Sequence, residues 1–230
     1  MIIRILLVVS ILIISERTIG QTNPSRKCTG SIVVDTSYSI QINPSLPIYE
    51  VHLLGRDSKD KEGYIHHCYE ITISNKNNES EVGVLIGFPS SSFDFQSEEE
   101  YPGLSFIDAN FDGYLDIKMY DGVSANGQNT AYNFYIFNPK TLKYIYDKPF
   151  SEKYGCNSYI DTSAKEIHTS GIIGCAGNCY VNEVYRSING QMVLVSRESV
   201  DQDPNNPSQL IYSKEELING VLKIVEREKR

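Results

Sequence analysis

Oxygen-bearing side chains stand at alternating positions of one short stretch, FIDANFDGYLDI, which runs from residue 106 to 117. Counted from its first aspartate, the first, third, fifth and ninth places are Asp108, Asn110, Asp112 and Asp116. Gly113 stands at the sixth place, where a chain that wraps around an ion must turn sharply. Carboxylate and amide oxygens in this order suit a hard cation, so the spacing predicts a calcium-binding loop.

The other positions of the loop indicate what kind of calcium site to expect. Tyr114, at the seventh place, would contribute its backbone carbonyl, as in an EF-hand loop. The twelfth place differs, because Met119 stands where an EF-hand has a bidentate glutamate. One carboxylate fewer predicts a dissociation constant of about 10⁻⁵–10⁻³ M, as in extracellular modules. The alternative is an ordinary turn rich in Asp and Asn that binds no ion.

We expect this ion to be structural rather than catalytic. A catalytic metal keeps an open position beside a base or nucleophile, and no His, Cys or Glu in such a role is spaced around the loop. The chain also lacks the G-x-S-x-G, P-loop and H-E-x-x-H motifs. We therefore expect no catalytic residues and a protein that is not an enzyme. A hydrolase with an unrecognised site is the weaker alternative.

The elements that must position this loop follow a period of two. The flanking segments LSFI and DIKMY alternate like strands, so the loop is expected to join two strands. In IVVDTSYSIQI (32–42) apolar residues share one face and polar residues the other, as in a half-buried strand. Similar short runs recur between Gly, Asn, Pro and Ser clusters, and no long stretch has helical periodicity. The sequence predicts an all-β fold, an antiparallel β-sandwich-like domain with a calcium-loop hairpin.

The first residues, MIIRILLVVSILIISERTIGQ, have the pattern of a secretory signal peptide. Arg4 precedes an apolar run (5–14), and the small residues Thr18 and Gly20 precede a cleavage site before Gln21. The apolar run is too short to span a membrane. We expect residues 1–20 to be removed, the protein to be exported, periplasmic or secreted, and the mature chain to have no membrane span.

After the signal peptide, we expect one domain over residues 21–200 and a separate C-terminal segment over 201–230. DQDPNNPSQ (201–209) is polar and contains proline, which predicts a linker. INGQMVLVSRE (188–198) and INGVLKIVERE (218–228) both begin with Asn-Gly, which favours a two-residue hairpin turn. The C-terminal segment is therefore predicted to be a hairpin or a tail, although SKEE (213–216) also suits a helix start.

Charge and cysteine content restrict the partners and the compartment. The formal net charge of −8 argues against nucleic acid or anionic lipid as a partner and is compatible with a basic protein. Export makes disulfides plausible, and an odd number of cysteines leaves at least one without an intramolecular partner. The five are Cys28, Cys68, Cys156, Cys175 and Cys179. We expect one or two disulfides near the last three, with the connectivity open.

Three segments, in this order, resemble a family of exported bacterial proteins. They are LSFIDANFDGYLDIKMYDG, AYNFYIFNPKTLKY and INGQMVLVSRE, and the resemblance covers about residues 100 to 200. The family has an aspartate loop of the FG-GAP type and comprises immunity proteins against secreted peptidoglycan hydrolases. It resembles the periplasmic inhibitors of invertebrate-type lysozyme. The resemblance implies a β-sandwich with a structural calcium ion and a loop that plugs a lysozyme-like cleft.

The segment DGVSANGQNTAY (121–132) follows the calcium hairpin directly and is rich in small residues. A hairpin pinned by an ion is a good base for an inserting loop. We predict Ser124, Asn126 and Tyr132 as contacts with a basic, lysozyme-like peptidoglycan hydrolase, whose association an acidic inhibitor would accelerate. The alternative is an exported, calcium-stabilised structural or adhesion-like module without inhibitory activity.

Overall fold

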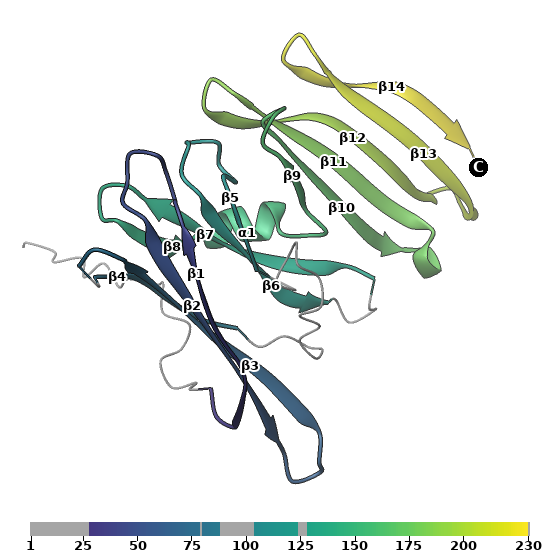
Figure 1. Ribbon diagram of the computed structural model, residues 1–230. Helices are drawn as coiled ribbons and strands as arrows, with labels where there is room; N and C mark the ends of the chain where they lie inside the picture. Colours follow the sequence, from purple (N-terminus) through teal and green to yellow (C-terminus); the bar gives the residue numbers. More distant parts are fainter. Residues whose placement is uncertain (1–27, 79, 88–103, 124–127, 230) are drawn as a thin grey trace, which may run out of the picture.

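A computed structural model describes residues 28–78, 80–87, 104–123 and 128–229 of the chain (Figure 1). The predicted signal peptide (1–20) and two predicted contacts, Ser124 and Asn126, lie outside these residues. Within them, the strands form three antiparallel sheets beside one short α-helix, which confirms the all-β, sandwich-like fold. No helix of the described part is long and apolar enough to cross a membrane.

The first sheet is a meander whose strands pair in chain order. It contains β1 (Ser31–Ile40), β2 (Tyr49–Lys59), β3 (Ile65–Asn75) and β4 (Glu81–Gly87). The period of two predicted for residues 32–42 is confirmed in part. Val34, Tyr38 and Ile40 pack against the core, but a register shift between Ile32 and Val34 leaves Ile32 exposed.

The second sheet carries the predicted calcium hairpin and is also a meander. It contains β5 (Leu104–Ile107), β6 (Asp116–Val123), β7 (Thr130–Asn138) and β8 (Lys143–Tyr146). The helix α1 (Lys148–Tyr154) follows. The Asp147 side chain caps it by accepting a 2.9 Å hydrogen bond from the Phe150 N–H.

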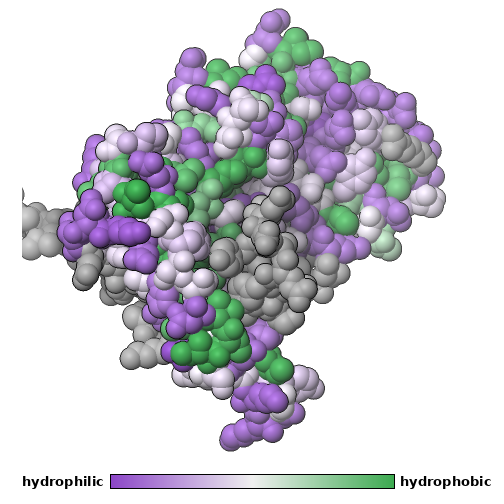
Figure 2. All heavy atoms as spheres, viewed as in Figure 1, coloured by the Kyte–Doolittle hydropathy of each residue, from purple (hydrophilic) through white to green (hydrophobic). Residues whose placement is uncertain are grey.

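The third sheet is the largest and has the order β14-β13-β12-β11-β10-β9. It contains β9 (Tyr159–Asp161), β10 (Glu166–Gly174), β11 (Cys179–Ile188), β12 (Gln191–Asp203), β13 (Asn206–Ile218) and β14 (Val221–Lys229). A 3-10 turn, Cys175–Gly177, joins β10 to β11. Hydrophilic residues dominate the surface of this sheet in Figure 2, with small hydrophobic patches among them.

The second sheet is the middle layer and is buried on both faces (Figure 1). Tyr135 and Phe137 of β7 join a core with β2 and β3 of the first sheet. Phe134, whose side chain points the opposite way as the strand alternates, joins a second core with α1 and the third sheet. Because β7 contributes to both cores and pairs with β6 on one side and β8 on the other, we call it the central strand.

The C-terminal segment contains the predicted hairpin, β13 and β14, but not the predicted linker. The boundary expected at residue 200 falls inside β12, and 201–209 contains the end of β12, a turn at Pro204 and Asn205, and the start of β13. Residues 213–216 are strand rather than helix, since β13 pairs on both sides. The two predicted Asn-Gly hairpins are confirmed: Asn189 and Asn219 both have positive φ angles, at 52° and 54°.

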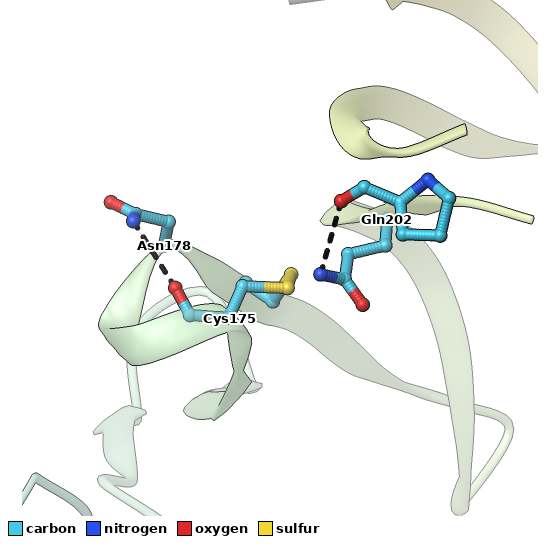
Figure 3. Close-up of a disulfide and its surroundings, with 5 residues drawn as sticks. Cys175, Asn178 and Gln202 are labelled. Atoms are coloured by element: carbon cyan, nitrogen blue, oxygen red, sulfur yellow. Dashed lines mark hydrogen bonds between the residues drawn. A yellow bond between two sulfur atoms is a disulfide. The ribbon is translucent and has the colours of Figure 1, made fainter.

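Two disulfides form in the described chain, Cys28–Cys68 and Cys175–Cys179. The second closes the turn between β10 and β11, where the Asn178 amide also donates to the Cys175 carbonyl oxygen (Figure 3). Cys156 is the free cysteine, and burial raises the pKa of its thiol. The odd count therefore leaves one thiol without a disulfide, as expected. One bridge, Cys175–Cys179, lies among the last three cysteines as predicted, whereas Cys28–Cys68 was not predicted.

Candidate metal-binding loop

The loop of residues 108–115 joins β5 to β6, whose pairing ends at Ile107 opposite Asp116. Its side-chain oxygens accept hydrogen bonds from backbone N–H groups of the same loop. Asp108 accepts from Asp112 at 3.0 Å and from Gly113 at 2.9 Å, one bond to each carboxylate oxygen. Asp112 in turn accepts from the Tyr114 N–H at 3.0 Å. The chain thus wraps around the Asp108 carboxylate through its own backbone hydrogen bonds.

Two residues of the loop have the positive φ angles that such tight wrapping requires. Gly113 has a φ of 90°, which agrees with the sharp turn predicted at the sixth place. Phe111 has a φ of 63°, which its residue type does not predict because a bulky residue rarely adopts this conformation. Its ring packs against the second core, and that contact helps to offset the conformational cost.

Asp116 differs from the other predicted ligands of the loop because its side chain is fully buried. One of its oxygens accepts from the N–H groups of Ala109 and Asn110, at 3.0 and 3.3 Å. The other accepts from the Phe137 N–H of β7 at 2.9 Å. Its carboxylate therefore joins both ends of the loop to the central strand.

Burial raises the pKa of Asp116 to about 7. The three backbone N–H groups oppose this rise, and the charge of Asp112 adds to it. Burial also raises the pKa of Asp108, with the N–H groups of Gly113 and Asp112 opposing and the Asp112 charge again adding. The loop thus concentrates negative charge that a cation would neutralise.

The loop is held against the first sheet by contacts that sequence spacing does not reveal. The Asn43 side-chain amide donates to the Gly113 carbonyl oxygen at 2.7 Å, and the Leu115 N–H donates to the Ile42 carbonyl oxygen at 2.9 Å. Tyr114 stacks its ring on Phe137, with centroids 5.6 Å apart. Asn43 lies seventy residues from its partner, so no local signal identifies it as part of the site.

The donor chemistry of the loop fits a hard cation, since Asp108, Asn110 and Asp112 present oxygen atoms close together in the chain. Two of the five predicted ligands, Asn110 and Asp116, already use their side chains in hydrogen bonds within the protein. Asp116 has both oxygens bonded to backbone N–H groups, and the Asn110 amide donates to Asp112 at 2.9 Å. Within the described ranges, no three His, Cys, Asp or Glu side chains are grouped so as to hold a metal ion.

Tyr132 is the predicted partner contact that the structure describes. Its ring lies 3.9 Å from the Lys118 ammonium and edge-on to Tyr120. Its N–H donates to the Gly155 carbonyl oxygen at 2.9 Å. Tyr132 is therefore half-buried within the fold, where it fixes the return from the 121–132 segment.

The end of that segment is also tied to the third sheet. The Asn129 side chain accepts from the Ile172 N–H at 2.8 Å and donates to its carbonyl oxygen at 2.9 Å. Asn157 accepts from the Thr130 N–H at 2.6 Å and donates to the Ser170 carbonyl oxygen at 3.0 Å. These bonds fix one end of the segment between the second and third sheets.

No protein-family profile matches the chain, and no curated protein matches it. One solved structure is similar, described as "Structure of a Xanthomonas Type IV Secretion System related protein". It is 16% identical, with a TM-score of 0.48, over 84% of this chain and 99% of that chain. The likeness is too distant to carry an argument. The resemblance to lysozyme inhibitors therefore stays a prediction.

Proposed function

We propose that the chain is an exported, calcium-stabilised β protein that binds and inhibits a lysozyme-like peptidoglycan hydrolase. The observation that carries the proposal is the oxygen-lined loop at 108–115, wrapped around Asp108 and anchored to the central strand by Asp116. A calcium ion would be held by Asp108, Asn110 and Asp112, with the Tyr114 carbonyl oxygen and Asp116 as the further predicted ligands. When bound, the ion neutralises these carboxylates and stabilises the hairpin.

Export is part of the same proposal. Two disulfides are typical of proteins that fold in an oxidising compartment, and the N-terminal sequence has the pattern of a signal peptide. The formal net charge of −8 would attract a basic hydrolase. The segment 121–132 is our candidate for insertion into its cleft, because it follows the hairpin and its end is fixed to the third sheet.

A second function is favoured by one observation, the half-buried position of Tyr132. A residue that packs on Lys118 and Tyr120 has a structural role that needs no partner. Under this reading the protein is a calcium-stabilised structural or adhesion-like module, and the loop serves stability alone. In both cases we propose a binding protein rather than an enzyme.

The proposal is tested by adding the purified protein to basic lysozymes of vertebrates and of invertebrates. The clearing of a peptidoglycan suspension is then followed for each enzyme. We expect slower clearing by at least one of them, with weaker inhibition at high salt, because surface charges are then screened. Asp112→Ala in the presence of chelator is the control, because it lacks the proposed ion and should inhibit less than the wild type with calcium. If no lysozyme is slowed, and no muramidase is recovered from bacterial envelope extract, the protein is a structural or adhesion-like module rather than an inhibitor.

A further inference from the structure

Strand β14 is an edge of the six-stranded sheet, because it pairs with β13 and with no other strand of the described chain. Its apolar side chains are unusually exposed: Val221 by 59%, Ile224 by 55% and Val225 by 45%. An edge strand turns the N–H and C=O groups of alternate residues away from its neighbour. β14 therefore offers both backbone groups and apolar side chains to another strand.

A bulge decides which side chains of β14 share a face. Ile224 lies opposite Glu215 and Glu226 lies opposite Lys214, so Val225 has no partner of its own in the ladder. Ile224 and Arg227 line the same hollow although they are three residues apart, as one extra residue requires. Lys223 and Glu226 then share the opposite face, where they lie opposite Glu216 and Lys214.

We infer that β14 pairs with β14 of a second copy, antiparallel, about a two-fold axis between Ile224 and Val225. In this register Ile224 of each copy lies opposite Val225 of the other. Lys223 of each copy lies opposite Glu226 of the other, on the same face, so two ion pairs form symmetrically. The two six-stranded sheets become one continuous sheet.

The order of charges on β14 disfavours a register that is shifted by one residue in either direction. Charged edges usually prevent pairing, but here they are self-complementary. A shift of one residue in one direction places Lys223 opposite Arg227, and a shift in the other direction places it opposite Val225. Lys214, which lies opposite Glu226, pairs with Glu216 at 3.1 Å. The side chains of Lys223 and Glu226 are both exposed and can reach a second copy.

The pairing should be weak, because two short strands bury less area than a standard protein interface. We expect dimers that appear in sedimentation velocity as the concentration rises from micromolar to near-millimolar. Val225→Lys should abolish them, since it places two ammonium groups beside the two-fold axis, at a position that has no partner in the β13 ladder. Val221→Lys, the same change at an exposed position away from the axis, should keep them.

A charge exchange tests the register itself. Lys223→Glu should abolish the dimer, and the double variant Lys223→Glu with Glu226→Lys should restore it. Amide exchange of β13 and β14 shows whether each variant keeps the hairpin. A wild type that stays monomeric throughout overturns the inference. So does a dimer that survives Val225→Lys, or one that the double variant fails to restore while its hairpin remains protected.

Discussion

At the scale of single residues, Asp116 is a carboxylate that the described fold buries completely. A fully buried carboxylate bonded to three backbone N–H groups ties the loop to β7. Burial nevertheless raises its pKa to about 7, above that of an aspartate in an unfolded chain. The folded state therefore binds this proton more tightly than the unfolded state does.

The free energy of unfolding therefore decreases as the pH rises from about 4 toward about 7. Asp116 contributes stability that is fully present below about pH 4 and is lost as pH rises toward about 7. With chelator present, the melting temperature of the wild type should fall relative to that of Asp116→Asn across this window. A difference in melting temperature between the two proteins that does not change with pH would show that folding does not raise the pKa of Asp116.

At the scale of elements, the short helix α1 depends on its cap. Asp147 accepts from the Phe150 N–H, and the Ser151 hydroxyl accepts from the Phe134 N–H of β7 at 2.8 Å. Asp147→Ala should cost about 1 kcal/mol, which corresponds to a fall of about 2–4 °C in melting temperature for a chain of this size. Asp147→Asn, which keeps an acceptor, should lose much less. Equal losses in the two variants would contradict the capping role.

Local sequence predicted elements well where the local signal decides the structure. The Asn-Gly turns at 189–190 and 219–220 and the sharp turn at Gly113 follow from residues that tolerate positive φ. The polar segment 201–209 is not the linker that its composition predicts, because its strand conformation comes from pairing between β12 and β13 rather than from its own residues. The contact of Asn43 with Gly113 depends on how two sheets dock, which spacing along the chain does not encode.

At the scale of the whole molecule, the loop joins the layers. Asn43 holds it to the first sheet, Asp116 holds it to the central strand, and Phe111 packs into the core shared with the third sheet. An ion bound by Asp108, Asn110 and Asp112 would therefore stabilise the fold as a unit. A ligand that binds the folded state alone stabilises it by about 2.7 kcal/mol at 100 times its dissociation constant.

The most direct test of this account is the melting temperature of the wild type with millimolar calcium and with chelator, measured beside two variants. Calcium should raise the melting temperature of the wild type. Asp112→Ala should abolish the increase, because it removes a ligand at the centre of the loop. Asp121→Ala should retain most of it, because Asp121 lies outside the loop in β6. A wild-type melting curve that calcium leaves unchanged would contradict the account and reduce the loop to an ordinary turn.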